Sequence, residues 1–134
     1  MNKNILDYLN ISDALDIVEK NGLYLGKIVP ENFSLWKNYN PTLLFIEGIN
    51  QFCVKVIRNA IKISDTSERL LPAQIKDLNL FKTPTYDPSI IEATFQKEMG
   101  LYITNFKTFD MSKKIISSEG KIYVSKIKFS SLNA

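Results

Sequence analysis

The chain has 134 residues, with a single cysteine and no histidine. This composition excludes a Ser-His-Asp triad, a Cys-His pair and a histidine-ligated zinc site within the sequence. The formal net charge of +3, from 17 basic and 14 acidic side chains, is too small to indicate nucleic-acid binding without a clustered basic stripe. We therefore predict one domain over residues 1–134, with no metal, no cofactor and no nucleic-acid partner.

The cysteine count and the hydropathy pattern indicate in which cellular compartment the protein is expected. Cys53 has no second cysteine with which to form a disulfide within the chain, and the N-terminus lacks the basic and apolar regions of a signal peptide. The most apolar stretch, residues 43–63, is interrupted by charged and amide side chains. We predict a cytoplasmic protein with no membrane span, in which Cys53 is a buried, unreactive thiol.

The N-terminal third contains short elements. Residues 4–9 show helical spacing, and residues 14–18 and 23–29 are β-rich runs separated by a Glu-Lys-Asn-Gly sequence. Asn-Gly is a strong hairpin signal, so we expect a hairpin here. Residues 30–39 have no sustained period and predict a loop. Three aromatic residues in that loop are expected to anchor it by packing: Phe33, Trp36 and Tyr39.

A long helix is predicted over about residues 41–62. Asn40 is a good N-cap residue, and Pro41 suits the first helical position because its missing N–H would have no partner there. Apolar side chains point in nearly every direction around this helix, which is typical of a buried helix. Glu47 lies within it, where a carboxylate is costly unless it is paired, so Glu47 is a candidate general acid. Pairing with Lys55 or Arg58 is the structural alternative.

The rest of the chain predicts strands separated by turns. Residues 64–67 are expected to form a polar loop, turns are expected at 98–100 and 110–112, and Gly120 could form a hairpin turn. Strands are expected over residues 73–81, 89–96, 101–109 and 113–129. A hairpin, one buried helix and an antiparallel meander predict an α+β fold in which a sheet wraps around a central helix.

This arrangement resembles the hot-dog fold, and the start of the helix resembles the 3-hydroxyacyl-ACP dehydratases. The family layout implies one long final strand, in which Gly120 marks a bulge or a close approach rather than a hairpin turn. Members of that family carry a proline, an apolar run, a catalytic Glu or Asp, and a Gln four residues later. In this sequence Pro41 matches the proline, residues 43–46 match the apolar run, and Glu47 and Gln51 match the acid and the glutamine. The family's catalytic histidine lies fourteen positions before the acid, and that count leads here to Phe33.

The resemblance implies a role for each matched residue. Glu47 is expected to be the catalytic acid, which protonates the leaving hydroxyl group, and Gln51 could orient it from one helical turn away. Thr42 replaces the glycine whose backbone N–H faces the thioester oxygen in family members. Phe33, at the histidine position, and Trp36 are expected to be packing anchors of their loop or part of an acyl-binding surface.

The missing histidine leads to three hypotheses. In the first, the chain is a dehydratase-like subunit that is inactive or weak alone, and a second hot-dog subunit supplies the histidine, as in the paired dehydratases of aryl-polyene pathways. The substrate would be a 3-hydroxyacyl group carried on the phosphopantetheine of acyl carrier protein. An exposed sheet edge would encourage a homodimer when the partner is absent, so the second subunit gives either a heterodimer or a homodimer. In the second, the chain is a hot-dog thioesterase that uses Glu47. In the third, it is a non-catalytic carrier-binding or scaffold subunit.

Overall fold

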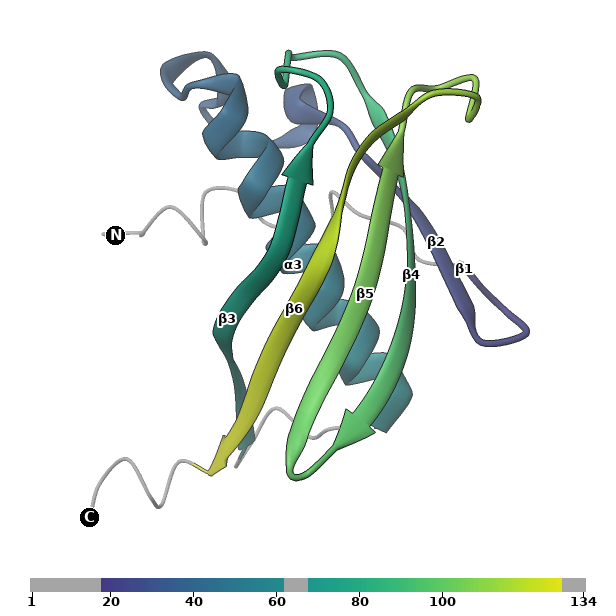
Figure 1. The fold of residues 1–134 in the computed structure, drawn as a ribbon. Helices are drawn as coiled ribbons and strands as arrows, with labels where there is room; N and C mark the ends of the chain where they lie inside the picture. Colours follow the sequence, from purple (N-terminus) through teal and green to yellow (C-terminus); the bar gives the residue numbers. More distant parts are fainter. Residues whose placement is uncertain (1–17, 62–67, 129–134) are drawn as a thin grey trace.

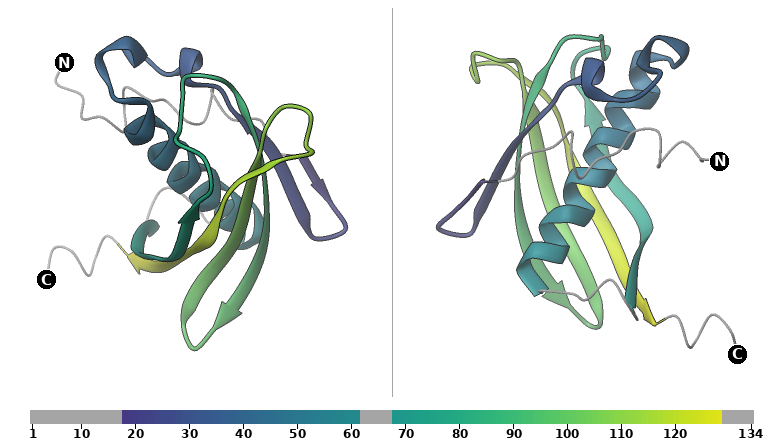
Figure 2. Two further views of the ribbon diagram at one scale, coloured as in Figure 1. Left: turned by 45° about the horizontal axis from the view of Figure 1, so that its top comes forward. Right: turned by 180° about the vertical axis from the view of Figure 1, so that it is seen from behind.

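The computed structural model describes residues 18–61 and 68–128 (Figure 1). Six antiparallel strands form one sheet in the order β1-β2-β4-β5-β6-β3, and a long helix, α3, lies against one of its faces (Figures 1 and 2). The elements are β1 (Val18–Lys20), β2 (Leu23–Ile28), η1 (Pro30–Asn32), η2 (Trp36–Asn38), α3 (Pro41–Ile61), β3 (Glu68–Leu80), β4 (Ser89–Glu98), β5 (Leu101–Phe109) and β6 (Ile116–Lys128). The predicted α+β class is confirmed.

Helix α3 and the sheet face beneath it form the hydrophobic core. The helix crosses strands β2 to β6 on the inner side of the curved sheet (Figure 2). Leu44, Phe52 and Val56 of the helix pack with Ile91 and Ile122 of the sheet, all of them fully buried. The side of α3 turned away from the sheet is only half-buried, and Leu43 is exposed. The prediction of a buried helix therefore holds for its sheet side.

The predicted hairpin is present as β1 and β2. Asn21 and Gly22 form its turn with φ angles of 54° and 81°, the left-handed conformation that Asn and Gly tolerate best. Glu19 and Lys20 are paired strand residues, so the turn has two residues where four were predicted. The predicted helix over residues 4–9, the first residues of the predicted strand over 14–18, and the predicted loop over 64–67 lie outside the described residues.

The last strand begins at Ile116, three residues later than predicted, because Asp110 organises a longer turn. One oxygen of its carboxylate accepts hydrogen bonds from Ser112 Oγ at 2.7 Å and from the backbone N–H groups of Lys114 and Ile115 at 3.2 and 3.4 Å. The Ser112 hydrogen bond and these backbone N–H groups hold the pKa of Asp110 below its usual value.

Gly120 lies inside β6 and not in a hairpin turn, and it combines both features that the family resemblance implied. It pairs with Phe106 of β5, and a Cβ atom at Gly120 would lie 2.8 Å from the tip of the Phe106 ring. On its other side the register of β3 shifts, so that Asp77 and Leu78 together face Gly120, and Asp77 has a φ of 54°. A bulge in β3 and the close approach of Phe106 therefore meet at this glycine.

Strand β3 lies at one edge of the sheet. It pairs with β6 on one side, and within the described residues no strand pairs with its other side. Its second half and the residue that follows are exposed, including four large apolar side chains: Ile75, Leu78, Leu80 and Phe81. An exposed edge with apolar side chains favours association with another chain.

Cys53 is fully buried in α3, as predicted, and burial holds the pKa of its thiol well above the usual value. The thiolate is the reactive form, so we expect Cys53 in the folded protein to react with a thiol reagent at pH 8 more than about tenfold slower than after denaturation. A kinetic assay with a chromogenic disulfide reagent measures both rates. Equal rates would show that the helix opens readily around Cys53.

Among the described residues, no helix is long and apolar enough to cross a membrane.

Candidate functional site

The candidate site begins at the N-terminus of α3. The Asn40 side chain caps the helix, with Oδ1 accepting a hydrogen bond from the Thr42 backbone N–H at 2.7 Å, and its carbonyl accepts from the Leu44 N–H at 3.2 Å. Pro41 occupies the first helical position, where a backbone N–H group would have no partner within the helix. The Thr42 N–H, which the resemblance directs toward a thioester oxygen, is therefore engaged by the cap.

The cap provides a stability prediction. Replacing Asn40 by alanine removes the acceptor for the Thr42 N–H, and loss of such a cap costs about 0.5–2 kcal/mol. We expect Asn40→Ala to lower the free energy of unfolding by about 1 kcal/mol, measured by urea titration. Asn40→Asp, which keeps an oxygen acceptor, serves as the control and should unfold close to the parent protein. Equal stability of Asn40→Ala and the parent would contradict the capping role.

Glu47 and Gln51 form a hydrogen-bonded pair one turn apart on α3. Gln51 Nε2 donates to Glu47 Oε2 at 3.1 Å. Glu47 is half-buried, whereas Gln51 is buried. The spacing of four residues places both side chains on one face of the helix, as the sequence indicated. The structure therefore joins the predicted acid to the predicted orienting residue.

The second polar atom of Gln51 has no donor among the described residues. Gln51 Oε1 is buried, and no described group hydrogen-bonds to it. The amide cannot simply turn over, because its oxygen would then face the Glu47 carboxylate. An unsatisfied buried acceptor costs about 1–3 kcal/mol, so a ligand or partner donor that reaches this atom would be stabilised. Gln51 thus holds the Glu47 carboxylate with its nitrogen, while its oxygen remains an unsatisfied buried acceptor.

Phe33 lies in the hydrophobic core. It is 1% exposed, at the end of η1, and packs in the same buried cluster as Ile28 and Leu44. Its backbone N–H donates to the Pro30 carbonyl at 3.0 Å, which fixes the loop around it. The predicted role of Phe33 as a packing anchor is consistent with this position. Its predicted contact with substrate stays a prediction.

The second loop anchor, Trp36, contacts a distant segment. Its ring meets Tyr86 of the β3–β4 loop edge-on, with centroids 5.1 Å apart, and the Tyr86 hydroxyl donates to the Tyr39 carbonyl at 2.8 Å. Trp36 and Tyr39 are partly buried against the core. These contacts tie the loop that precedes α3 to the loop that follows β3.

Thr42 lies beside a shallow cavity that sequence reasoning missed. The cavity has a volume of about 290 Å³ and is lined by Thr42 and by residues 80–84 at the end of the exposed strand β3. Its walls come from two segments that are about forty residues apart in the sequence, so no local motif predicts it. The helix start, where the predicted site begins, therefore opens toward the same edge of the sheet that presents apolar side chains.

The structure brings together part of the predicted site. Glu47 and Gln51 are in contact, and Thr42 is on the same helix, whereas Phe33 lies in the core below. Within residues 18–61 and 68–128, no three acidic, cysteine or histidine side chains gather as metal ligands would. The chemistry available at this site is that of a carboxylate with an amide neighbour.

Comparison with known proteins gives structural relatives only. No family and no curated protein matches the sequence. The dehydratase heterocomplex ApeI:P from Xenorhabdus doucetiae contains a similar chain, with a TM-score of 0.68 and 12% identity over 98% of this chain and 97% of that one. A mutant thioesterase from Pseudomonas aeruginosa has a TM-score of 0.65 and 7% identity, covering 96% and 97% of the two chains. A thioesterase from Haemophilus influenzae has a TM-score of 0.63 and 8% identity, covering 92% and 82%.

These likenesses establish the fold. The six-stranded antiparallel sheet around one long helix is the hot-dog fold, as the sequence resemblance predicted. Both a dehydratase complex and thioesterases adopt it. At identities this low the fold alone is shown, and the reaction must be argued from the residues of this chain.

Proposed function

We propose that this chain is a dehydratase-like hot-dog subunit that acts on 3-hydroxyacyl thioesters carried on acyl carrier protein, together with a second hot-dog subunit. The observation that carries the proposal is the Glu47–Gln51 hydrogen bond, which holds a carboxylate in one orientation on the central helix. A positioned acid is one half of the machinery that dehydration needs. The sequence contains no histidine to serve as the other half.

The proposed reaction assigns one proton transfer to each subunit. A histidine of the second subunit removes a proton from the carbon next to the thioester carbonyl. The electron pair forms the carbon–carbon double bond, the bond to the hydroxyl oxygen breaks, and Glu47 gives that oxygen a proton so that it leaves as water. Gln51 holds the Glu47 carboxyl group toward the substrate. The Thr42 N–H is engaged by Asn40, so the dipole of α3 would stabilise the charge on a thioester oxygen placed near the helix start.

The sheet edge supports the presence of a second subunit. Strand β3 ends beside Thr42, and the two share the walls of the 290 Å³ cavity. Leu80 and Phe81, at this point, are 43% and 53% exposed. A subunit that covered this apolar edge would place its own residues next to the start of α3. The likeness to a chain of a dehydratase heterocomplex supports the same arrangement.

The test is reconstitution with a hot-dog subunit that carries the family histidine. The two chains are co-expressed, purified as a complex, and supplied with 3-hydroxyacyl thioesters on acyl carrier protein, and the enoyl product is measured by mass spectrometry. We expect product from the complex and little from either chain alone. Failure of histidine-bearing hot-dog subunits from the same genome to bind this chain or to raise its rate would contradict the proposal.

A thioesterase reaction is the second candidate, and it is favoured by a carboxylate that has no histidine partner in this sequence. Glu47 could activate water for attack on the thioester carbonyl, which releases a free acid and a thiol and requires no histidine. The thioesterases of the same fold support this alternative. Release of thiol by the chain alone, lost in Glu47→Gln, would favour it over dehydration.

A further inference from the structure

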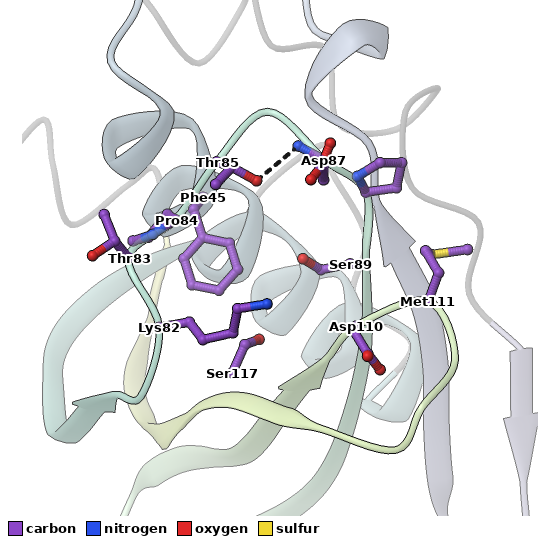
Figure 3. Close-up of a pocket in the computed structure, with 11 residues that line it drawn as sticks. Phe45, Lys82, Thr83, Pro84, Thr85, Asp87, Ser89, Asp110, Met111 and Ser117 are labelled. Atoms are coloured by element: carbon purple, nitrogen blue, oxygen red, sulfur yellow. Dashed lines mark hydrogen bonds between the residues drawn. The ribbon is translucent and has the colours of Figure 1, made fainter.

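A second cavity lies between the β3–β4 loop, the β5–β6 turn and Phe45 of α3 (Figure 3). It has a volume of about 370 Å³, within the range of small-molecule sites, and Phe45 of α3 forms one wall. Phe45 and Glu47 are two residues apart, so their side chains project about 200° apart around the helix. Residues 82–84 also line the smaller cavity beside Thr42, so the two cavities share a wall, whereas Glu47 and Gln51 line neither of them.

Lys82 supplies the positive charge of this cavity. Figure 3 shows its ammonium group turned toward the centre, in the space bounded by Phe45, Ser89 and Ser117. No hydrogen bond or ion pair joins Lys82 Nζ to another described residue. The Lys82 side chain is exposed, and its charge contributes to the lowered pKa of Asp110. Its ammonium group has donors left for an anionic ligand, and a charged hydrogen bond is about twice as strong as a neutral one.

Three hydroxyl groups, joined by hydrogen bonds, place a hydrogen-bond donor next to the same space. Thr108 Oγ1 lies 2.5 Å from Ser118 Oγ and 2.7 Å from Ser117 Oγ, and Thr108 and Ser118 are fully buried. If Ser117 donated inward, the Ser118 proton would be left buried without an acceptor, which is costly. The favoured direction runs from Ser118 to Thr108 to Ser117. The Ser117 hydroxyl therefore keeps its own proton for a ligand in the cavity.

The two carboxylates of the lining are engaged or remote. Asp110 accepts hydrogen bonds from its own turn, and in Figure 3 its carboxylate is turned away from Lys82. Asp87 lies at the far end of the cavity from Lys82 and Ser117, where its backbone N–H donates to Thr85 Oγ1 at 3.1 Å. The lining therefore contains two carboxylates and one ammonium group, with Lys82 and Ser117 together at the end away from Asp87.

We propose that this cavity binds the oxyanion of a small organic ligand, either a carboxylate or a phosphate monoester. Lys82 and Ser117 donate to the oxyanion, and the Ser89 hydroxyl provides a third polar contact. Phe45, Pro84 and Met111 contact the apolar body of the ligand. Carboxylate and phosphate share the required chemistry, namely negatively charged oxygen atoms at the end of a short apolar chain.

Calorimetric titration of the full-length protein tests the proposal with three matched probes: hexanoate, hexyl phosphate and neutral 1-hexanol. We expect saturable binding of at least one anion below about 10 mM and much weaker binding of hexanol. The stronger anion identifies the ligand class. In Lys82→Gln the affinity for that anion should fall about tenfold or more, and in Ser117→Ala about threefold to tenfold.

Two control variants locate the binding site. Lys114→Gln removes an exposed lysine of the β5–β6 turn that does not line the cavity, and Glu47→Gln alters a residue of α3 that does not line it either. Both should bind the anion as the parent protein does. Absence of saturable binding by either anion, unchanged affinity in Lys82→Gln, or loss of binding in Glu47→Gln would overturn the proposal. Because the readout is binding, failure of the dehydration assay would leave this result intact.

Discussion

Replacing Glu47 by glutamine in the complex with the second subunit is expected to lower the rate of dehydration by about 10²–10⁴-fold, the contribution typical of a positioned acid or base. The amide keeps the size of the carboxyl group but has no proton of suitable acidity to give to the leaving hydroxyl group. Gln51 donates to Glu47 Oε2, and it can donate equally to the amide oxygen of the variant. The geometry should therefore survive while the proton transfer is lost.

Two measurements separate this effect from damage to the fold. The free energy of unfolding of Glu47→Gln should match that of the parent within about 1 kcal/mol, since surface and half-buried polar substitutions of equal size are mild. The matched control is Glu31→Gln, an exposed glutamate in η1, which should keep full activity. Full activity of a well-folded Glu47→Gln complex would contradict a catalytic role and would favour a carrier-binding or scaffold subunit.

The helix and the first hairpin could be predicted because their signals are local. Asn40 and Pro41 mark the start of α3, and the structure confirms the cap and the first turn. Asn21 and Gly22 adopt the positive φ angles that their sequence favours. In both cases the deciding interactions lie within a few residues, so the sequence contains nearly all the information that determines the conformation.

Strand β3 was harder to predict because its environment is decided by distant residues. The prediction began the strand after Pro72, whereas the structure begins it at Glu68 and pairs Pro72 with Val124. Proline is tolerated in an edge strand, where its missing N–H need not reach a neighbour, and the position of β3 at the edge follows from the sheet order. That order cannot be read from the residues around Pro72.

The candidate site divides in the same way. The Glu47–Gln51 contact follows from a spacing of four residues within one helix, so the sequence indicated it. The cavity around Lys82 takes its walls from α3, the β3–β4 loop and the β5–β6 turn. The hydroxyl chain that ends at Ser117 depends on the register between β5 and β6. Neither feature has a signal in any single segment.

The close contact between Gly120 and Phe106 predicts a large effect of substitution on stability. We expect Gly120→Ala to lower the free energy of unfolding by about 1–3 kcal/mol, as overpacking of a core usually does. The new methyl group would lie 2.8 Å from the tip of the Phe106 ring. It cannot move far from the ring, because the Leu78 Cα atom lies 3.3 Å away on the other side. Phe106 is 2% exposed, so its ring has little free space into which to move.

A double-mutant cycle measured by urea denaturation tests this cause. Phe106→Leu shortens the side chain and should be destabilising alone, through the space that it leaves. When Phe106→Leu is added to Gly120→Ala, the shorter side chain removes the clash with the new methyl group. The free-energy changes of the two substitutions should therefore couple by about 1 kcal/mol or more. Gly22→Ala is the control, because Gly22 has a φ of 81° and no neighbour within 4 Å of an added Cβ, so its cost should simply add to that of Phe106→Leu. Additive behaviour at Gly120 would show that the conformation of the β3 bulge, rather than the Phe106 ring, requires glycine there.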